Sequence, residues 1–291
     1  MAKAFTRERI DALAMLAKKL RHLIVHNTQL TGGGHFGASL SMVEVLTALY
    51  WEIMRVDAQN PKWEGRDYFV LSKGHACAGF APILAEKGFF DPQLLSTFNQ
   101  LDSCFGMHTT LKMNGVEHPT GSLGHGLNVG LGIALGLKLD NKPNRVFVLI
   151  GDGEQQEGSV WEAIMAAGNW GVDNLIAVVD RNFLSQDGAT EELMRLEPLA
   201  EKWRSFNWSV KTVDGHDMGS VLNGLAVLPF EPNKPSCLIA ETVKGKGVSF
   251  MENQHKWHYG IMTDAQYATA TREVGFEGER LRSHEILGID A

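Results

Sequence analysis

Two groups of residues in the sequence have the types and spacing that metal binding and proton transfer require. The first is the turn Gly151-Asp152-Gly153, which follows the β-rich run 145–150, together with Asn182, which follows the β-rich run 174–179. Carboxylate and amide oxygens are hard ligands suited to Mg²⁺, and the glycines beside Asp152 let the backbone come close to a bound anion. This group therefore predicts a site for Mg²⁺ and a phosphate-bearing ligand.

The second group is a set of histidines in glycine-rich or strand-end segments, where functional residues concentrate. An imidazole in such a place can titrate near neutrality and pass protons to and from hydroxyl groups. The histidines of this kind are His35, His75, His108 and His258. The histidines for which we expect structural roles are His22, His26, His118, His216 and His284.

Short β-rich runs and helical patterns alternate along most of the chain. A first helix is expected over residues 6–26, and the β-rich runs are 68–71, 145–150, 174–179, 208–213 and 236–243. This alternation predicts an α/β fold with a mostly parallel sheet covered by helices on both faces. Because the carboxyl ends of adjacent parallel strands lie together, Asp152 and the amide oxygen of Asn182 can reach one metal ion.

The composition limits the partners and the location of the protein. A chain of 291 residues with 44% hydrophobic and 21% charged residues fits one large domain over residues 1–291. The formal net charge of −7 argues against a nucleic-acid partner, which selects a basic face. No stretch approaches the roughly 18 apolar residues of a membrane span, and the charged first helix is unlike a signal peptide. We therefore expect no membrane contact and a cytoplasmic location.

Two further glycine patterns receive structural interpretations. The string Gly32-x-Gly34-x-x-Gly37 matches the dinucleotide-binding pattern, but it follows a helix rather than a strand, so we reject that function. Glycines also recur along an apolar run, where we expect them to permit close helix packing, within the chain or across a subunit interface. They are Gly126, Gly130, Gly132 and Gly136.

Taken together, these segments resemble the transketolase family of thiamine diphosphate enzymes. Besides the Gly-Asp-Gly turn, the resemblance rests on Glu157-Gly158, Trp161-Glu162-Ala163, Asp180-Arg181-Asn182 and Asp187-Gly188, which follow one another in the family's order. It extends over nearly the whole chain. The resemblance implies the thiamine-diphosphate-binding fold, as a diphosphate-binding domain, with thiamine diphosphate and Mg²⁺ as cofactors and Ca²⁺ or Mn²⁺ able to substitute.

The resemblance also implies which residues hold the metal and the diphosphate. The family's metal ligands fall on Asp152, Asn182 and the backbone carbonyl of Leu184. Its phosphate-contacting glycine falls on Gly153, and His75 matches a histidine that contacts the diphosphate. The metal site would thus combine side-chain and backbone oxygens with oxygens of the cofactor.

Proton transfer and the remaining cofactor contacts fall on other segments. His35 is the first proton-transfer candidate by resemblance, His108 takes the place of a substrate-facing histidine, and His258 is a third catalytic candidate. His258 also lies near the diphosphate with Lys244, and His255 competes with it for that position. The loop expected to hold the aminopyrimidine side of the cofactor contains Gly121, Ser122 and Leu123.

The implied reaction transfers a two-carbon ketol unit from a ketose, often phosphorylated, to an aldose. Full-length transketolases continue into a pyrimidine-binding domain, which supplies the glutamate that activates the cofactor, and into a C-terminal domain. We expect both on a separate chain, in a heterotetramer of two plus two chains with the cofactor sites between them. Glu157 and Glu162 match family positions near that interface.

Two departures from the family concern the substrate. Tyr259-Gly260 follows the late Trp-His pair where some relatives have a Lys two residues after the His, and Asn99 stands where long transketolases have an Arg. Both weaken the match to the standard pentose phosphates. A sulfonated, branched or deoxy sugar phosphate therefore stays open.

Three alternative functions remain on the sequence alone. An α subunit of a 2-oxoacid dehydrogenase shares the module from Gly-Asp-Gly to Asn182, but His35, His75 and the 121–126 loop are not expected there in this order. A deoxyxylulose-phosphate synthase type enzyme would use pyruvate as its donor. A non-catalytic, cofactor-holding paralogue would be expected to have lost some cofactor positions, whereas here each is filled.

Overall fold

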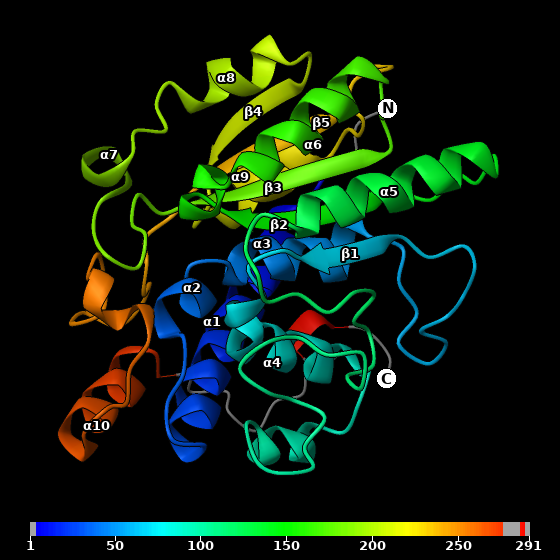
Figure 1. Cartoon of the computed structure of the whole chain (residues 1–291). Coiled ribbons are helices and arrows are strands. Elements are labelled where there is room, and N and C mark those ends of the chain that lie inside the picture. Colours follow the sequence, from blue (N-terminus) through cyan, green and yellow to red (C-terminus); the bar gives the residue numbers. More distant parts are fainter. Residues whose placement is uncertain (1–3, 276–285, 289–291) are drawn as a thin grey trace.

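The computed structural model describes residues 4–275 and 286–288, so His284 lies outside the described residues. Five parallel strands form one sheet in the order β1-β2-β3-β5-β4, and Figure 1 shows helices on both of its faces. The strands are β1 (Tyr68–Leu71), β2 (Val146–Gly151), β3 (Leu175–Arg181), β4 (Ser209–Asp214) and β5 (Ser236–Glu241). The predicted α/β class with a parallel sheet is confirmed.

The helices vary from single turns to the long first helix, whose N-cap is Thr6 because its hydroxyl accepts a bond from the amide of Arg9. The α-helices are α1 (Arg7–Leu30), α2 (Phe36–Leu40), α3 (Val43–Ala48), α4 (Cys77–Lys87), α5 (Gly126–Leu139), α6 (Gly158–Asn169), α7 (Thr190–Leu193), α8 (Leu199–Ser205), α9 (Met218–Leu225) and α10 (Asp264–Glu273). Shorter 3₁₀ or π segments are η1 (Leu49–Ile53), η2 (Gly74–Ala76), η3 (Pro92–Thr97), η4 (Gly153–Gln156) and η5 (His255–His258).

Alternate residues of the central strands feed two separate hydrophobic cores. In β2, Phe147 and Leu149 join the core formed with α1 to α4 and α9, whereas Val146, Val148 and Ile150 join the core formed with α5, α6 and α8. Every residue of β3 is buried, which explains its nearly continuous apolar run. A sheet covered on both faces leaves its carboxyl edge as the place where polar side chains can gather.

Helix α5 lies unusually close to the sheet because two of its glycines lack side chains. A Cβ on Gly126 would stand 2.3 Å from Ser72 Oγ, and one on Gly130 would stand 2.4 Å from Val148 Cγ2. By contrast, a Cβ on Gly132 or Gly136 would meet nothing within 4 Å. The expected close packing therefore holds within the chain for Gly126 and Gly130, whereas Gly132 and Gly136 are exposed, and packing across a subunit interface stays a prediction for them.

No helix within the described part of the chain has both the length and the apolar character that crossing a bilayer requires.

The two kinds of glycine on α5 give a test of this packing. We expect Gly130→Ala to lower the free energy of unfolding by about 1–3 kcal/mol, because the new methyl group overpacks the contact with Val148. Gly132→Ala is the matched control and should raise stability by about 0.5–1 kcal/mol through helix propensity alone. Urea unfolding of both variants measures this, and an equal effect at the two positions would contradict the packing described here.

Candidate active site

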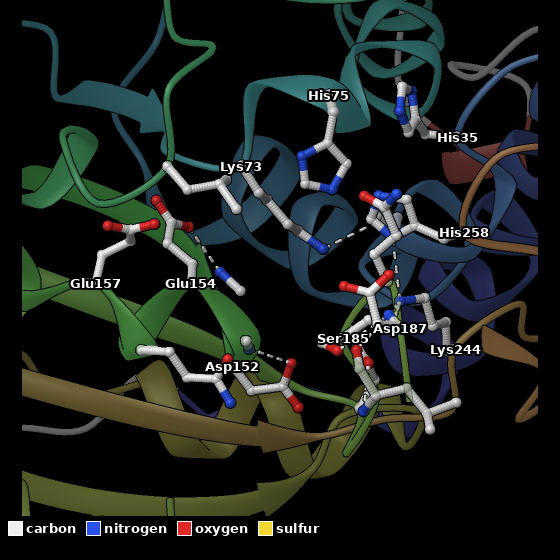
Figure 2. A pocket seen from close by; sticks show the side chains of 18 of the residues that line it. His35, Lys73, His75, Asp152, Glu154, Glu157, Ser185, Asp187, Lys244 and His258 are labelled. Carbon is white, nitrogen blue, oxygen red and sulfur yellow. Dashed lines mark hydrogen bonds between the residues drawn. The ribbon is translucent and has the colours of Figure 1, made fainter. Parts of the chain in front are cut away.

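A cavity of about 450 Å³ opens at the carboxyl edge of the sheet. Its walls come from the segments that follow β1, β2, β3 and β5, together with His35 before α2 and His258 in η5. Figure 2 shows His35 and His75 on one side of this cavity and Asp152 and Glu154 on another. The predicted site residues that line it are His35, His75, His108, Leu123, Asp152, Gly153, Asn182, Leu184, Lys244 and His258.

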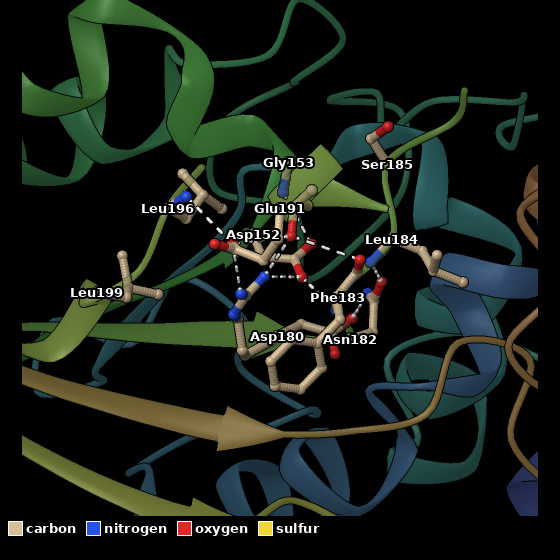
Figure 3. Close-up of polar contacts among 12 residues, drawn as sticks. Asp152, Gly153, Asp180, Asn182, Phe183, Leu184, Ser185, Glu191, Leu196 and Leu199 are labelled. Carbon is tan, nitrogen blue, oxygen red and sulfur yellow. Dashed lines mark hydrogen bonds and ion pairs between the residues drawn. The ribbon is translucent and has the colours of Figure 1, made fainter. Parts of the chain in front are cut away.

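Asp152 is held in place by donors from two strand-end segments. Its Oδ1 accepts the amide of Gly153 at 2.8 Å, and its Oδ2 accepts the amide of Phe183 at 2.6 Å and Nη1 of Arg181 at 3.1 Å. Burial and the nearby charge of Asp180 raise the pKa of Asp152, while Arg181 opposes that rise. Figure 3 shows this carboxylate beside the segment that carries Asn182 and Leu184.

Asn182 and Leu184 present oxygens next to Asp152. Asn182 Nδ2 donates to Asp180 Oδ2 at 3.4 Å, which orients the amide, and its Oδ1 accepts only a 3.2 Å bond from the amide of Leu184. The carbonyls of Leu184 and Ser185 accept Nζ of Lys244 at 3.1 and 2.8 Å. These two carbonyls therefore already face a cation.

The donor set fits a hard divalent cation. Asp152, Asn182 and Leu184 all line the cavity and supply carboxylate, amide and carbonyl oxygens, the ligands that Mg²⁺ prefers. Among the described residues, no cluster of three or more His, Cys, Asp or Glu side chains forms a metal site by itself. A metal here would thus need further oxygens from a bound cofactor or water.

Four histidines gather over this donor set. The ring centroid of His35 lies 5.1 Å from that of His75, 5.3 Å from His258 and 6.3 Å from His108. The rings of His75 and His258 are 4.9 Å apart. Residues distant in the sequence thus form one imidazole cluster, which joins His75 to the three predicted proton-transfer residues; the catalytic roles of those three stay predictions.

Burial keeps three of these imidazoles neutral. It lowers the pKa of His35 to about 4, that of His258 to about 3 and that of His75 to about 2, with smaller contributions from neighbouring cations. Burial also lowers the pKa of Lys244 to about 8. At neutral pH the histidines can accept a proton or donate a ring N–H, but they add no fixed charge.

The expected aminopyrimidine loop is only partly in the cavity. Leu123 lines it, whereas Gly121 and Ser122 are exposed and are not part of its lining. Glu154 connects this loop to the Gly151-Asp152-Gly153 turn. Its Oε1 accepts a hydrogen bond from the amide of Gly124 at 2.9 Å, and its Oε2 accepts one from the amide of Gly151 at 3.0 Å. Roles for Gly121 and Ser122 therefore stay predictions.

Several buried charged residues beside the cavity could not be singled out from the sequence. Lys73 forms an ion pair with Asp180, and both side chains are nearly inaccessible to solvent. Glu154 also accepts a bond from Ser72 Oγ, and burial raises its pKa. The only indication of Lys73 in the sequence was its place in the strand-end segment that contains His75. The sequence does not show which buried charges pair with each other.

The remaining expectations concern residues near the rim. His258 lines the cavity and His255 does not, which leaves His258 in the position for which they competed. The ring of Tyr259 lies 5.2 Å from that of His35, while Asn99 is exposed and outside the cavity lining. Away from the site, His216 has a structural role, because its Nε2 accepts the amide of Val243 and its Nδ1 lies 3.1 Å from Glu44.

The fold and the cavity together define an α/β domain with a set of oxygen donors beside a group of four histidines, of which burial keeps His35, His75 and His258 neutral. The family model described as "Transketolase, thiamine diphosphate binding domain" matches residues 13–285. The chain therefore belongs to the transketolase family, as its thiamine diphosphate binding domain.

Individual relatives extend this conclusion. The chain is 42% identical to a subunit of the apulose-4-phosphate transketolase of Phocaeicola vulgatus, over 94% of this chain and 97% of that protein. It is 40% identical to the 6-deoxy-6-sulfo-D-fructose transketolase subunit SqwG of a Clostridium species, over 90% of this chain and 96% of that protein. Along nearly its whole length the chain corresponds to a transketolase N-terminal subunit of this kind.

Solved structures agree with the fold. The transketolase of Campylobacter jejuni superposes with a TM-score of 0.86 at 29% identity, over 94% of this chain and 44% of that protein. The transketolase of Leishmania mexicana gives the same TM-score at 27% identity. The chain thus spans less than half the length of these solved transketolases.

Because His75 is buried in its neutral form, the stability of the protein depends on pH. Its folded-state pKa of about 2 lies below the ordinary value of 6.5, so below pH 6.5 the unfolded chain takes up a proton that the folded protein does not. Stability is therefore lost on acidification, by about 2 kcal/mol from His75 alone at about pH 5.

We expect His75→Gln to remove this part of the acid sensitivity, while His35 and His258 preserve the rest. Urea unfolding of wild type and variant at about pH 7.5 and about pH 5 measures the difference in slope. Parallel losses in the two proteins would mean that His75 is not buried as a neutral imidazole.

Proposed function

We propose that this chain is the cofactor-binding subunit of a two-subunit transketolase that depends on thiamine diphosphate and a divalent cation, Mg²⁺ with Ca²⁺ or Mn²⁺ as substitutes. Its single domain would act with a partner chain carrying the pyrimidine-binding and C-terminal domains. The reaction is transfer of a two-carbon ketol unit from a ketose or ketose phosphate to an aldose or aldose phosphate.

One observation carries the proposal: a single cavity contains both an oxygen donor set for a cation and a cluster of four histidines. Asp152, Asn182 and the carbonyl of Leu184 would bind the metal, and the amide of Gly153 together with His75 and Lys244 would hold the diphosphate. The predicted cofactor and proton-transfer residues therefore share one site, which is what ketol transfer requires.

Thiamine diphosphate, when bound, would supply a carbon nucleophile and an electron sink for C–C cleavage. The protein positions the substrate and handles its protons. The ring of His35 lies 6.3 Å from that of His108 and 5.3 Å from that of His258, and the three histidines would exchange protons with substrate hydroxyl and carbonyl oxygens. Burial keeps His35 and His258 unprotonated near neutral pH, so each could accept a proton or donate a ring N–H, and their pKa values of about 4 and about 3 make them weak bases.

A partner chain is supported by the carboxylates of the cavity and by the relatives. Glu154 is committed to Ser72, Gly124 and Gly151, and is therefore not free to activate an aminopyrimidine. We assign that role to a glutamate of the partner. The relatives named as subunits support this division, and we propose an assembly of two plus two chains with Glu157 and Glu162 near the interface.

The substrate is proposed to differ from the standard pentose phosphates. Two relatives are named for apulose-4-phosphate and for 6-deoxy-6-sulfo-D-fructose. Tyr259, whose ring lies against His35, is one of the departures at the rim of the cavity. We therefore favour a modified or branched sugar, phosphorylated or sulfonated, as donor.

A non-catalytic, cofactor-holding paralogue is the second candidate, since it would use the same binding residues. Relatives named as transketolases do not favour the 2-oxoacid dehydrogenase or deoxyxylulose-phosphate synthase alternatives. Turnover of a ketose–aldose pair by the assembled protein separates a catalyst from a paralogue that only binds.

The first measurement is calorimetric titration of thiamine diphosphate with Mg²⁺ into this chain alone and into its complex with the native partner. We expect binding that requires Mg²⁺ and that strengthens with the partner, because the aminopyrimidine side of the site is then completed. Chelation with EDTA should abolish it. Absence of binding in both states would remove the cofactor from the proposal.

Two substitutions test the division of roles. Asp152→Ala should abolish Mg²⁺-dependent binding of thiamine diphosphate, because it deletes the charged metal ligand. His35→Ala should leave binding within about threefold of wild type and reduce turnover by about 10²-fold or more, as loss of a proton-transfer group does. Calorimetry and a ketol-transfer assay measure the two effects; equal loss of binding in both variants would refute the assignment.

A further inference from the structure

Arg181, at the end of β3, is almost completely buried, with 1% of its side chain exposed. Its Nη1 donates to Asp152 Oδ2 at 3.1 Å and to Thr190 Oγ1 at 2.7 Å. Its Nη2 donates to Glu191 Oε1 and Glu197 Oε1, both at 2.9 Å, and its Nε donates to Glu197 at 3.2 Å. A guanidinium has five N–H donors, so every donor of Arg181 has a partner.

The first of these contacts fixes the orientation of the Asp152 carboxylate. Arg181 and the amide of Phe183 both donate to Oδ2, whereas Oδ1 accepts a single bond from Gly153. A carboxylate oxygen has two lone pairs, so Oδ1 keeps one free. Since Asp152 lines the cavity, the guanidinium selects which carboxylate oxygen is available to a ligand there.

The other contacts of Arg181 link the two ends of the segment that follows β3, residues 182–197. Glu191 and Glu197 bracket the far end of this segment, and Thr190 Oγ1 is a third acceptor. The guanidinium also stacks on the ring of Phe183, 4.0 Å from its centroid. The residues enclosed by these contacts include Asn182, Leu184, Ser185 and Asp187, all of which line the cavity.

We propose that Arg181 is a positioning residue for the metal site: it orients Asp152 and clamps residues 182–197 so that the oxygens of Asp152, Asn182 and Leu184 converge before a metal binds. The identity of the ligand in this inference rests on the proposed function. The clamp does not depend on the proposed function, because it consists of contacts within this chain. Neighbours that orient metal ligands commonly change metal affinity by about 10- to 100-fold when they are removed.

A lysine at position 181 distinguishes positioning by the guanidinium from an effect of positive charge alone. Lysine keeps the positive charge but has three donors on one atom, and these cannot reach acceptors spread around a planar guanidinium. If only the charge mattered, Arg181→Lys would resemble wild type. If the fork of donors matters, Arg181→Lys and Arg181→Gln should be impaired alike.

The test uses this chain in complex with its native partner and measures Mg²⁺ affinity by calorimetry at saturating thiamine diphosphate. We expect Arg181→Lys and Arg181→Gln to bind Mg²⁺ about 10- to 100-fold more weakly than wild type. Raising the Mg²⁺ concentration should restore cofactor binding, because the ligands themselves are intact. Unchanged Mg²⁺ affinity in both variants would overturn the proposal, and wild-type behaviour of Arg181→Lys alone would reduce it to a charge effect, which also contradicts it.

Arg66→Lys is the matched control, since Arg66 forms a bidentate pair with Glu117 at 2.7 and 2.9 Å away from the cavity. It should lose stability without losing Mg²⁺ affinity. An equal loss of affinity in Arg66→Lys would attribute the effect to general destabilisation and overturn the proposal.

Hydrogen exchange without cofactor or metal tests the clamp directly. We expect faster amide exchange over residues 182–197 in Arg181→Gln and no such change in Arg66→Lys. Equal protection of this segment in Arg181→Gln and wild type would refute the clamp. If wild type itself binds no metal, the proposed function fails, and the exchange comparison still decides whether Arg181 orders the segment.

Discussion

The carboxylate of Asp180 is buried at the end of β3, and the arrangement of the cavity depends on how it is paired. It accepts bonds from Lys73 after β1, from Ser41 after α2 and from Thr242 after β5. A buried charge that lost these partners would be strongly destabilising, so the segments that provide them are held together. These are the segments that bring His75, His35 and Lys244 to the cavity.

Much of this architecture could be predicted from sequence because it follows from periodicity. The apolar runs of β2 and β3 indicated the strands, and the residues directly after them, Asp152 and Asn182, fall at a common sheet edge by geometry alone. The four histidines that line the cavity could be singled out because they lie in glycine-rich or strand-end segments. What could not be predicted was the pairing of Lys73 with Asp180 and the convergence of several acceptors on Arg181, since such contacts join distant residues and leave no periodic signal.

Charged side chains and uncharged histidines lie in different parts of the cavity wall. Asp152, Asp180, Arg181 and Lys73 neutralise one another in pairs below, whereas burial holds the histidines above in their uncharged form. Asp152 and Asp180 are therefore held in fixed orientations by the bonds that they accept. Such preorganisation is what allows a site to recognise an anionic ligand by direction as well as by charge.

The contact of Lys244 with the carbonyls of Leu184 and Ser185 has a consequence for how the site is filled. The ammonium group acts as a built-in counterion, because it satisfies carbonyl dipoles that would otherwise lack a partner. A carbonyl oxygen has two lone pairs, so a metal ion that takes the Leu184 carbonyl as a ligand would bind beside this ammonium. Filling the site would then place two cations against neighbouring carbonyls, and an anionic ligand would offset their repulsion.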